Sequence, residues 1–231
     1  MKIILAGIEY VGTTTLSNLL REWKKDVMGD PFYLDISHDH FKIPHTSGHP
    51  DNTTLEEQDQ ILALSPKLKE MYHRYAIYYH VRHYMQDDDL TIGLHIEESI
   101  LARKYYGYGL DGTEFDRKNR VFNEVESHIK KMTDDPIIIV HMVANEDVIK
   151  ERMLKLSETL DHSNSPMKVG DIKFILKEYE EWISMSSIGP VIKIDTSFDS
   201  PTGTLEKLIT KLEPHYTKRD TERIRNHQIN K

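Results

Sequence analysis

Short apolar runs recur along the chain at wide intervals, and each run is too short to form a helix. Their residues are apolar at successive positions, which suits strands that are buried on both faces, as in a parallel sheet. Segments with a helical period alternate with the runs. The runs are residues 3–6, 32–36, 90–94, 137–140 and 191–194, and the helical segments are residues 14–28, 55–85, 117–132, 146–156, 171–185 and 204–212. This alternation predicts an α/β fold in three layers with right-handed crossovers.

Length and composition favour a single globular domain. The 231 residues are 38% hydrophobic and 29% charged, which is ordinary for such proteins. We expect one domain over residues 1–215, followed by a polar tail over residues 216–231 that is loose at its end. Within the domain, the segment 55–85 is expected to break near Pro66, because proline cannot continue a helix without a kink.

Charge and residue usage exclude several classes of function. The formal charge of -8 disfavours binding to nucleic-acid polymers, which requires a basic stripe, and binding to anionic membrane surfaces. The chain has no cysteine, so disulfides, thiolate catalysis and Cys-ligated metals are excluded. It has neither the features of a signal peptide nor an apolar run of about 18 residues, so we expect a soluble cytoplasmic protein.

A glycine-containing segment follows the first predicted strand and precedes the first predicted helix. It reads GIEYVGTTT and has the outline of a phosphate-binding loop, G-x-x-x-x-G-K-[ST]. In this position successive backbone N–H groups converge on a phosphate, and the helix N-terminus adds a favourable partial charge. Thr14 stands where the hydroxyl that binds Mg²⁺ is expected. We therefore predict a nucleotide site that includes Gly7, Tyr10, Val11, Gly12, Thr13, Thr14 and Thr15.

The loop departs from this pattern at one position, because Thr13 stands where lysine is expected. That lysine brings positive charge to the β- and γ-phosphates, and charge held in place supplies much of phosphoryl-transfer catalysis. Threonine donates a hydrogen bond without the charge. The alternative is a strand–turn–helix that shares its glycines with the motif by coincidence. We favour the phosphate loop and leave its catalytic competence open.

With its further motifs included, the chain resembles the P-loop nucleoside and nucleotide kinases, and thymidylate kinases in particular, over roughly residues 1 to 215. The likeness lies in the order and spacing of the loop, EMYHRYAIYYHVRHYM, LTIGLHIEESILARKYYGYG and IIIVHMVANEDVIKERMLK. It implies a five-stranded parallel sheet in the order 2-3-1-4-5, a lid over about residues 152–170, ATP and Mg²⁺ as cofactors, and a nucleoside or nucleotide substrate. Kinases of this type often pair through helices, so the resemblance also points to a homodimer.

The resemblance implies roles for individual residues as well. Arg74 on the long helix would hold an acceptor phosphate, and Arg152 and Lys155 would contact the donor phosphates. The segment KIDTS, residues 193–197, stands next to the place where adenine usually lies. Where these kinases carry an Asp-Arg pair at the end of the third strand, this chain has Leu94 and His95 instead.

A second set of candidates follows the second predicted strand, at the carboxyl edge where open α/β sheets bind ligands. Asp39 would accept a proton from a substrate hydroxyl, and its alternative role is to cap a turn. Either His40 or Phe41 would stack on, or hydrogen-bond to, a substrate base. The spacing of the histidines in this loop matches no regular zinc site, so we prefer a polar loop to a metal site. These histidines are His38, His40, His45 and His49.

Three more candidates stand where the third predicted strand meets its helix. On an extended segment His95 and Glu97 point the same way, which makes His95 a candidate substrate ligand. Glu97 or Glu98 is a candidate general base, or a Mg²⁺ ligand through water. The alternative for both glutamates is electrostatic stabilisation of a helix N-terminus. Arg103 is a candidate for the acceptor side.

These predictions combine into one leading function, the ATP-dependent phosphorylation of a nucleoside, a nucleotide or a related small acceptor. Asp39 or the glutamate pair handles the proton. A lid cation, which is Arg152, Lys155 or Lys168, supplies the charge that Thr13 lacks. The rival is a nucleotide-binding protein that has lost transfer activity and acts as a sensor or scaffold. A third interpretation is a hydrolase that transfers the phosphoryl group to water.

Overall fold

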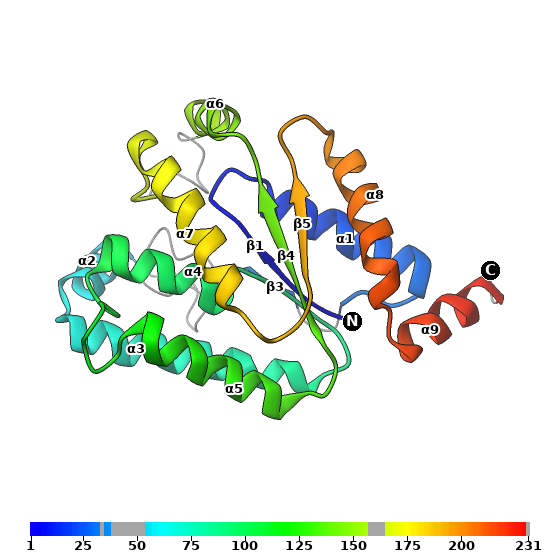
Figure 1. Ribbon diagram of the computed structural model, residues 1–231, viewed down its shortest axis with the longest axis horizontal. Helices are drawn as coiled ribbons and strands as arrows, with labels where there is room; N and C mark the ends of the chain where they lie inside the picture. Colours follow the sequence, from blue (N-terminus) through cyan, green and yellow to red (C-terminus); the bar gives the residue numbers. More distant parts are fainter. Residues whose placement is uncertain (33–34, 38–53, 157–164, 230–231) are drawn as a thin grey trace.

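The protein is built around a parallel β-sheet with helices on both faces (Figure 1). The computed structural model describes residues 1–32, 35–37, 54–156 and 165–229. Within these ranges the sheet has five strands in the order β2-β3-β1-β4-β5. The strands are β1 (Lys2–Ala6), β2 (Asp35–Ser37), β3 (Asp89–Ile92), β4 (Ile137–Val143) and β5 (Val191–Asp195). The predicted α/β fold with a parallel sheet between helical layers is confirmed.

The helices form a layer on each face of the sheet. Figure 1 shows α1, α8 and α9 on one face, and α3, α4, α5 and α7 on the other. The described helices are α1 (Thr13–Met28), α2 (Leu55–Ala63), α3 (Pro66–Val81), α4 (Leu94–Leu101), α5 (Phe122–Met132), α6 (Glu146–Leu156), α7 (Ile172–Met185), α8 (Pro201–Leu212) and α9 (Lys218–Ile229). The predicted break near Pro66 is confirmed, since α2 ends at Ala63 and α3 begins at Pro66. None of these helices is both long and apolar enough to span a lipid bilayer.

The strand register brings the functional segments to one edge of the sheet. Leu5 on β1 pairs with Ile92 on β3 and with Val140 on β4, so these parallel strands end close together. Every residue of β1 is buried, as the unbroken apolar run predicts. The segments that leave β1, β3, β4 and β5 therefore meet at the carboxyl edge, where such sheets bind ligands.

The edge strand β5 differs from the expectation of burial on both faces. Alternate residues Val191, Lys193 and Asp195 are exposed, whereas Ile192 and Ile194 are buried. A strand at the edge of the sheet has a neighbour on one side only, and here one of its faces is open to solvent. The amine of Lys193 on that face binds Glu180 on α7 at 2.9 Å.

The polar C-terminal segment forms a helix over residues 218–229, α9, which packs on α1. The predicted loose end of the tail, residues 230–231, lies outside the described residues. Ahead of this helix, the ring of Tyr216 lies 6.4 Å from that of Trp23. Asp220 is fully buried and accepts a hydrogen bond from the Thr217 backbone. Arg223 donates to Asp88 at 2.6 Å, just before β3. Ion pairs and aromatic packing hold this polar segment in place.

Candidate phosphate-binding site

Glycine at two positions fixes the loop between β1 and α1. A Cβ on Gly7 would lie 2.5 Å from the carbonyl oxygen of Met142, so only glycine allows the loop to pass this close to β4. Gly12 has a φ of 99°, in the left-handed region that favours glycine, and it is the N-cap of α1. Between them, Tyr10 has a φ of 68°, a strained value for this residue that clusters at functional sites.

The first turn of α1 opens at the carboxyl edge of the sheet. Among the described residues no side chain caps this helix at Gly12. The first amides of an α-helix have no partner within the helix, and together with the helix dipole they favour an anion. Thr13 is half-buried, and Thr14 and Thr15 are exposed beside these amides. The role of Thr14 as a Mg²⁺ ligand stays a prediction from the motif.

Arg152 on α6 contacts the loop from its outer side. Its guanidinium donates to the carbonyl oxygens of Tyr10 at 3.3 Å and Val11 at 3.4 Å, and to that of Thr196 at 2.6 Å. The hydroxyl of Thr196 also donates to the Val11 oxygen, at 2.9 Å. In a trans peptide the C=O and N–H point in opposite directions, so the amide of Gly12 is turned away from Arg152. The loop is thus bonded to the residue that follows β5. The side of the loop away from Arg152, its inner face, carries the Gly12 amide, which can donate to a ligand.

The other predicted cations lie elsewhere. The amine of Lys155 bonds Glu151 at 2.5 Å, one turn back along α6, and both side chains are about two-thirds exposed, at 69% and 65%. Lys168 is exposed before η4 (Val169–Asp171), a short 3₁₀ turn that leads into α7. Of the three cations proposed to replace the loop lysine, the structure brings Arg152 against the loop. Burial lowers the pKa of Arg152, but an arginine stays charged in proteins.

Glu97 lies in the first turn of α4, just after β3, and the local backbone differs from the prediction. Gly93 and Leu94 both have positive φ, of 73° and 44°, and α4 starts at Leu94. His95 and Glu97 are therefore on a helix, about 200° apart around its axis, and the expectation that they point the same way is wrong. The carboxylate of Glu97 folds back over Gly93, where a Cβ would overlap Oε2. The hydroxyl of Tyr179 on α7 donates to the same oxygen at 3.4 Å.

Glu98 is part of a buried ionic network, in contrast to the predicted role at the site. Arg117 donates two hydrogen bonds to Glu98, at 2.8 and 2.6 Å, and a third to Glu70 on α3 at 2.6 Å. The guanidinium stacks on the ring of Tyr108 at 5.3 Å. Burial acts to lower the pKa of Arg117, but the adjacent carboxylates outweigh it and raise that pKa. This network joins α3 and α4 and places Glu98 in the interior.

His95 is also an interior residue, with 1% of its surface exposed. Its Nε2 lies 3.2 Å from the carboxylate of Glu126 on α5, and its ring packs on Phe122 at 4.8 Å. The structure therefore places His95 in the packing of α4 against α5, and the predicted contact with substrate is replaced by this one. Arg103, the other predicted contact, pairs with Asp111 at 2.8 Å and stacks on Trp182 at 5.5 Å.

A polar cluster that the motif analysis missed joins the loop to the segment before α7. Glu9, inside the phosphate loop, is buried and accepts a hydrogen bond from Ser165 at 2.5 Å. Tyr105 lies in η2 (Ala102–Tyr106), a π-helical turn, and donates to Asp171 at 2.9 Å. Lys104 pairs with the same carboxylate at 2.9 Å. The only signal for this cluster in the sequence is an acidic residue inside a motif that binds anions.

The proximity of these groups shifts the pKa values of two tyrosines. Burial, with a further contribution from the charge of Glu9, raises the pKa of Tyr10 to about 12. Burial also raises the pKa of Tyr105, and Asp171 and Glu9 raise it further. Both phenols are therefore neutral donors at ordinary pH, next to a carboxylate of the loop.

The remaining predicted residues cannot be placed at the site. Asp39, His40, Phe41 and the other histidines of the 38–49 loop lie outside the described residues, as does any metal site made from them. Arg74 lies on α3, but its side chain is also outside the description. Within the described ranges, no three His, Asp or Glu side chains are grouped to hold a metal ion.

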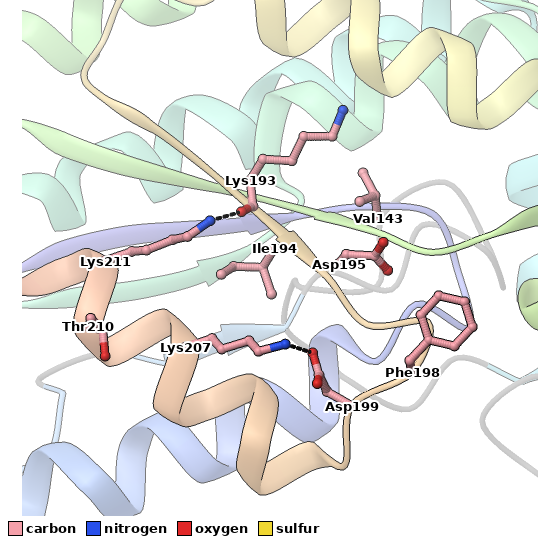
Figure 2. A pocket seen from close by; sticks show the side chains of 9 residues that line it. All are labelled: Val143, Lys193, Ile194, Asp195, Phe198, Asp199, Lys207, Thr210 and Lys211. Atoms are coloured by element: carbon pink, nitrogen blue, oxygen red, sulfur yellow. Dashed lines mark hydrogen bonds and ion pairs between the residues drawn. The ribbon is translucent and has the colours of Figure 1, made fainter.

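A pocket of about 740 Å³ lies beside this edge, between β5 and α8. Figure 2 shows Phe198 at one end, near Asp195 and Val143, and Thr210 and Lys211 at the other. Phe198 is 84% exposed, which is unusual for a phenylalanine. Lys207 bridges to Asp199 at 2.6 Å, and Lys211 donates to the backbone oxygen of Lys193 at 2.8 Å. The end at Phe198 adjoins Thr196, which is bonded to the phosphate loop.

Comparison with known proteins gives a fold and no closer relation. No protein-family model matches the sequence, and no curated protein matches it either. Among solved structures, deoxyadenosine kinase from M. mycoides with bound dATP aligns with a TM-score of 0.58 at 15% identity, over 92% of this chain and 99% of that chain. The YorR protein from Bacillus subtilis, in complex with phosphorylated GDP, aligns with a TM-score of 0.55 at 18% identity, over 94% of this chain and 99% of that chain.

The chain shares the fold of these two proteins. The predicted resemblance to nucleoside and nucleotide kinases is thereby confirmed at the level of the fold, over nearly the whole chain. The chain departs from the motifs expected from the sequence resemblance at Thr13, in the loop, and at Leu94 with His95, after β3. At identities of 15% and 18%, these alignments show a shared fold and not a shared ligand.

Proposed function

We propose that the protein is a phosphotransferase that moves the terminal phosphoryl group of ATP to a nucleoside, a nucleotide or a related small acceptor. The observation that carries the proposal is the glycine-constrained loop at the start of α1. Its carbonyls face Arg152, and its Gly12 amide is turned to the inner side. The kinase fold, which deoxyadenosine kinase shares, supports the same reaction class.

In the proposed reaction the acceptor hydroxyl attacks the terminal phosphorus of the donor. A bond forms between that oxygen and phosphorus, the bond to the β-phosphate oxygen breaks, and ADP leaves with the electron pair. The proton of the hydroxyl passes to a carboxylate. We assign this role to Glu97, whose side chain lies over Gly93 at the carboxyl edge. Asp39, outside the described residues, is the alternative base.

We also propose Mg²⁺ as cofactor, with the Thr14 hydroxyl as its protein ligand. Thr14 is exposed in the first turn of α1, so its side chain is open to solvent at the N-terminus of the helix. Oxygen donors of this kind suit Mg²⁺. When bound with the donor, the ion neutralises charge on the transferring group. That contribution is needed here because Thr13 brings no charge and Arg152 lies on the outer side of the loop.

Turnover with defined acceptors tests the proposal. Purified protein with ATP and Mg²⁺ is expected to release ADP only when an acceptor from a panel of nucleosides and deoxynucleotides is present. Nucleotide binding without any turnover would favour the rival, a sensor or scaffold, which the loss of the loop lysine supports. ADP release that does not depend on an acceptor would identify a hydrolase.

The base of the donor is proposed to stack on Phe198. This exposed ring stands at the end of the pocket that adjoins Thr196 and the loop. Stacking of a base on an aromatic ring contributes about 1–3 kcal/mol.

Phe198→Ala is therefore expected to raise the KM for ATP at least about 5-fold, with kcat at saturating ATP nearly unchanged. The control is Val191→Ala, at the opposite end of β5, and steady-state kinetics compare both variants with the wild type. A KM for ATP that is the same in Phe198→Ala as in the wild type and the control would contradict the assignment.

A further inference from the structure

Glu97 and Tyr179 meet in the interior although they come from different helices. Glu97 is in the first turn of α4, and Tyr179 is in the middle of α7; their exposed fractions are 2% and 1%. The Tyr179 hydroxyl donates to Oε2 of Glu97 at 3.4 Å. Tyr179 and Trp182 are both core residues of α7, and Trp182 packs on Phe122 at 5.2 Å. The hydroxyl is therefore presented to Glu97 by a rigid helix.

The same carboxylate oxygen of Glu97 also packs against Gly93. Oε2 of Glu97 lies over the Cα of Gly93, in space that any other side chain would occupy. The amide of Gly93 donates to the carbonyl oxygen of Leu5 at 2.8 Å, two residues before Gly7 and the start of the phosphate loop. Oε2 of Glu97 thus contacts both a backbone position tied to the loop and a hydroxyl from α7.

The charged groups that act on Tyr179 are Glu97 and Glu9. Burial raises the pKa of Tyr179 well above its ordinary value, and the charges of Glu97 and then Glu9 raise it further. The phenol therefore stays protonated and acts as a donor throughout the working range of pH. A donor next to a carboxylate favours the ionised form of that carboxylate.

We propose that Tyr179 is a positioning residue for the reaction, which holds Glu97 ionised and directed so that it can accept the proton of the acceptor hydroxyl. This inference rests on the proposed phosphotransfer and deepens it. It gives α7 a function beyond covering the sheet. It also accounts for Gly93, because the carboxylate needs the space that a side chain there would fill.

Tyr179→Phe tests the inference because it removes the hydroxyl and keeps the ring in the core. The acid limb of the pH profile of kcat is expected to move upward by about half a unit to one unit. The KM for ATP should stay the same, because the donor contacts the loop and not Tyr179. Glu97→Gln is expected to remove the acid limb and to lower kcat by roughly 10²- to 10⁴-fold. Tyr216→Phe, a tyrosine on the α9 side of the sheet, is the matched control and should keep the wild-type profile.

The outcomes separate this inference from the proposed function. Suppose that the wild type is active. If Tyr179→Phe then has the same acid limb as the wild type, or if Glu97→Gln keeps an acid limb, the positioning role is overturned while phosphotransfer stands. A wild type without turnover would overturn the proposed function instead. In that case ¹³C-carboxyl NMR, with the Glu97 signal assigned from Glu97→Gln, still tests the contact. A titration midpoint that does not move between wild type and Tyr179→Phe would then overturn it.

Discussion

Arg117→Met is expected to lower the free energy of unfolding by about 3–5 kcal/mol, because it leaves two buried carboxylates without their cation. Arg117 is fully buried, and it donates to both Glu98 and Glu70, which are each 1% exposed. Because both carboxylates are buried, water cannot solvate their negative charges in place of the guanidinium. Urea denaturation, with the midpoint and slope compared with those of the wild type, measures the loss.

The pH dependence of this variant identifies the cause. Without the cation, burial favours the protonated form of the two carboxyls, so the folded variant binds more protons than the unfolded chain does. Its stability relative to the wild type is then expected to rise as pH is lowered from 7.5 towards 5.5. Arg103→Met is the control, because Arg103 pairs at the surface with Asp111 and should lose less than about 1 kcal/mol. A loss for Arg117→Met as small as for this control would contradict a structural role for the network.

Gly7→Ala is expected to lower kcat/KM for ATP roughly a hundredfold, since a displacement of about 1 Å at a reacting site has an effect of that size. The added methyl would lie 2.5 Å from the Met142 carbonyl oxygen and 2.9 Å from the Val11 side chain. Because β4 is a central strand, the loop is the part that moves. The strain should also destabilise the fold by about 1–3 kcal/mol.

A second glycine provides the control for this experiment. Gly203 lies in α8, where the nearest atom to an added Cβ is 3.4 Å away. Gly203→Ala should therefore bind ATP as the wild type does. Equal affinity for ATP in the Gly7→Ala and Gly203→Ala variants would mean that the loop does not form the donor site.

The sheet and the loop could be predicted from sequence because their signals are local. Apolar residues at 3–6 and 137–140 are consecutive, and consecutive burial is the property of central parallel strands. Gly7 and Gly12 lie within a few residues of the strand and helix that they connect. In contrast, α9 has a polar sequence, and the partners that hold Arg223 in this helix and Tyr216 ahead of it are Asp88 and Trp23, which lie far away along the chain.

The candidate site was harder to predict because its charged residues have distant partners. Glu98 and His95 are adjacent to a strand end, as a catalytic residue would be. Their partners Arg117 and Glu126 are 19 and 31 residues away in sequence, and no local pattern connects them. The positive φ values of Gly93 and Leu94 start the helix early and turn Glu97 back over Gly93. Both glutamates are buried, and only the folded backbone shows that Glu97 turns back over Gly93 whereas Glu98 faces Arg117.

The central claim is that main-chain amides at the start of α1 bind a nucleotide phosphate although Thr13 replaces the usual lysine. Calorimetric titration of the wild type with ATP and Mg²⁺ tests it most directly, with thermal unfolding as a second readout. We expect saturable binding at one site, and a gain in stability of about 2.7 kcal/mol when ATP is at 100 times its Kd. A flat titration and an unchanged Tm with ATP, GTP and their diphosphates would contradict the claim.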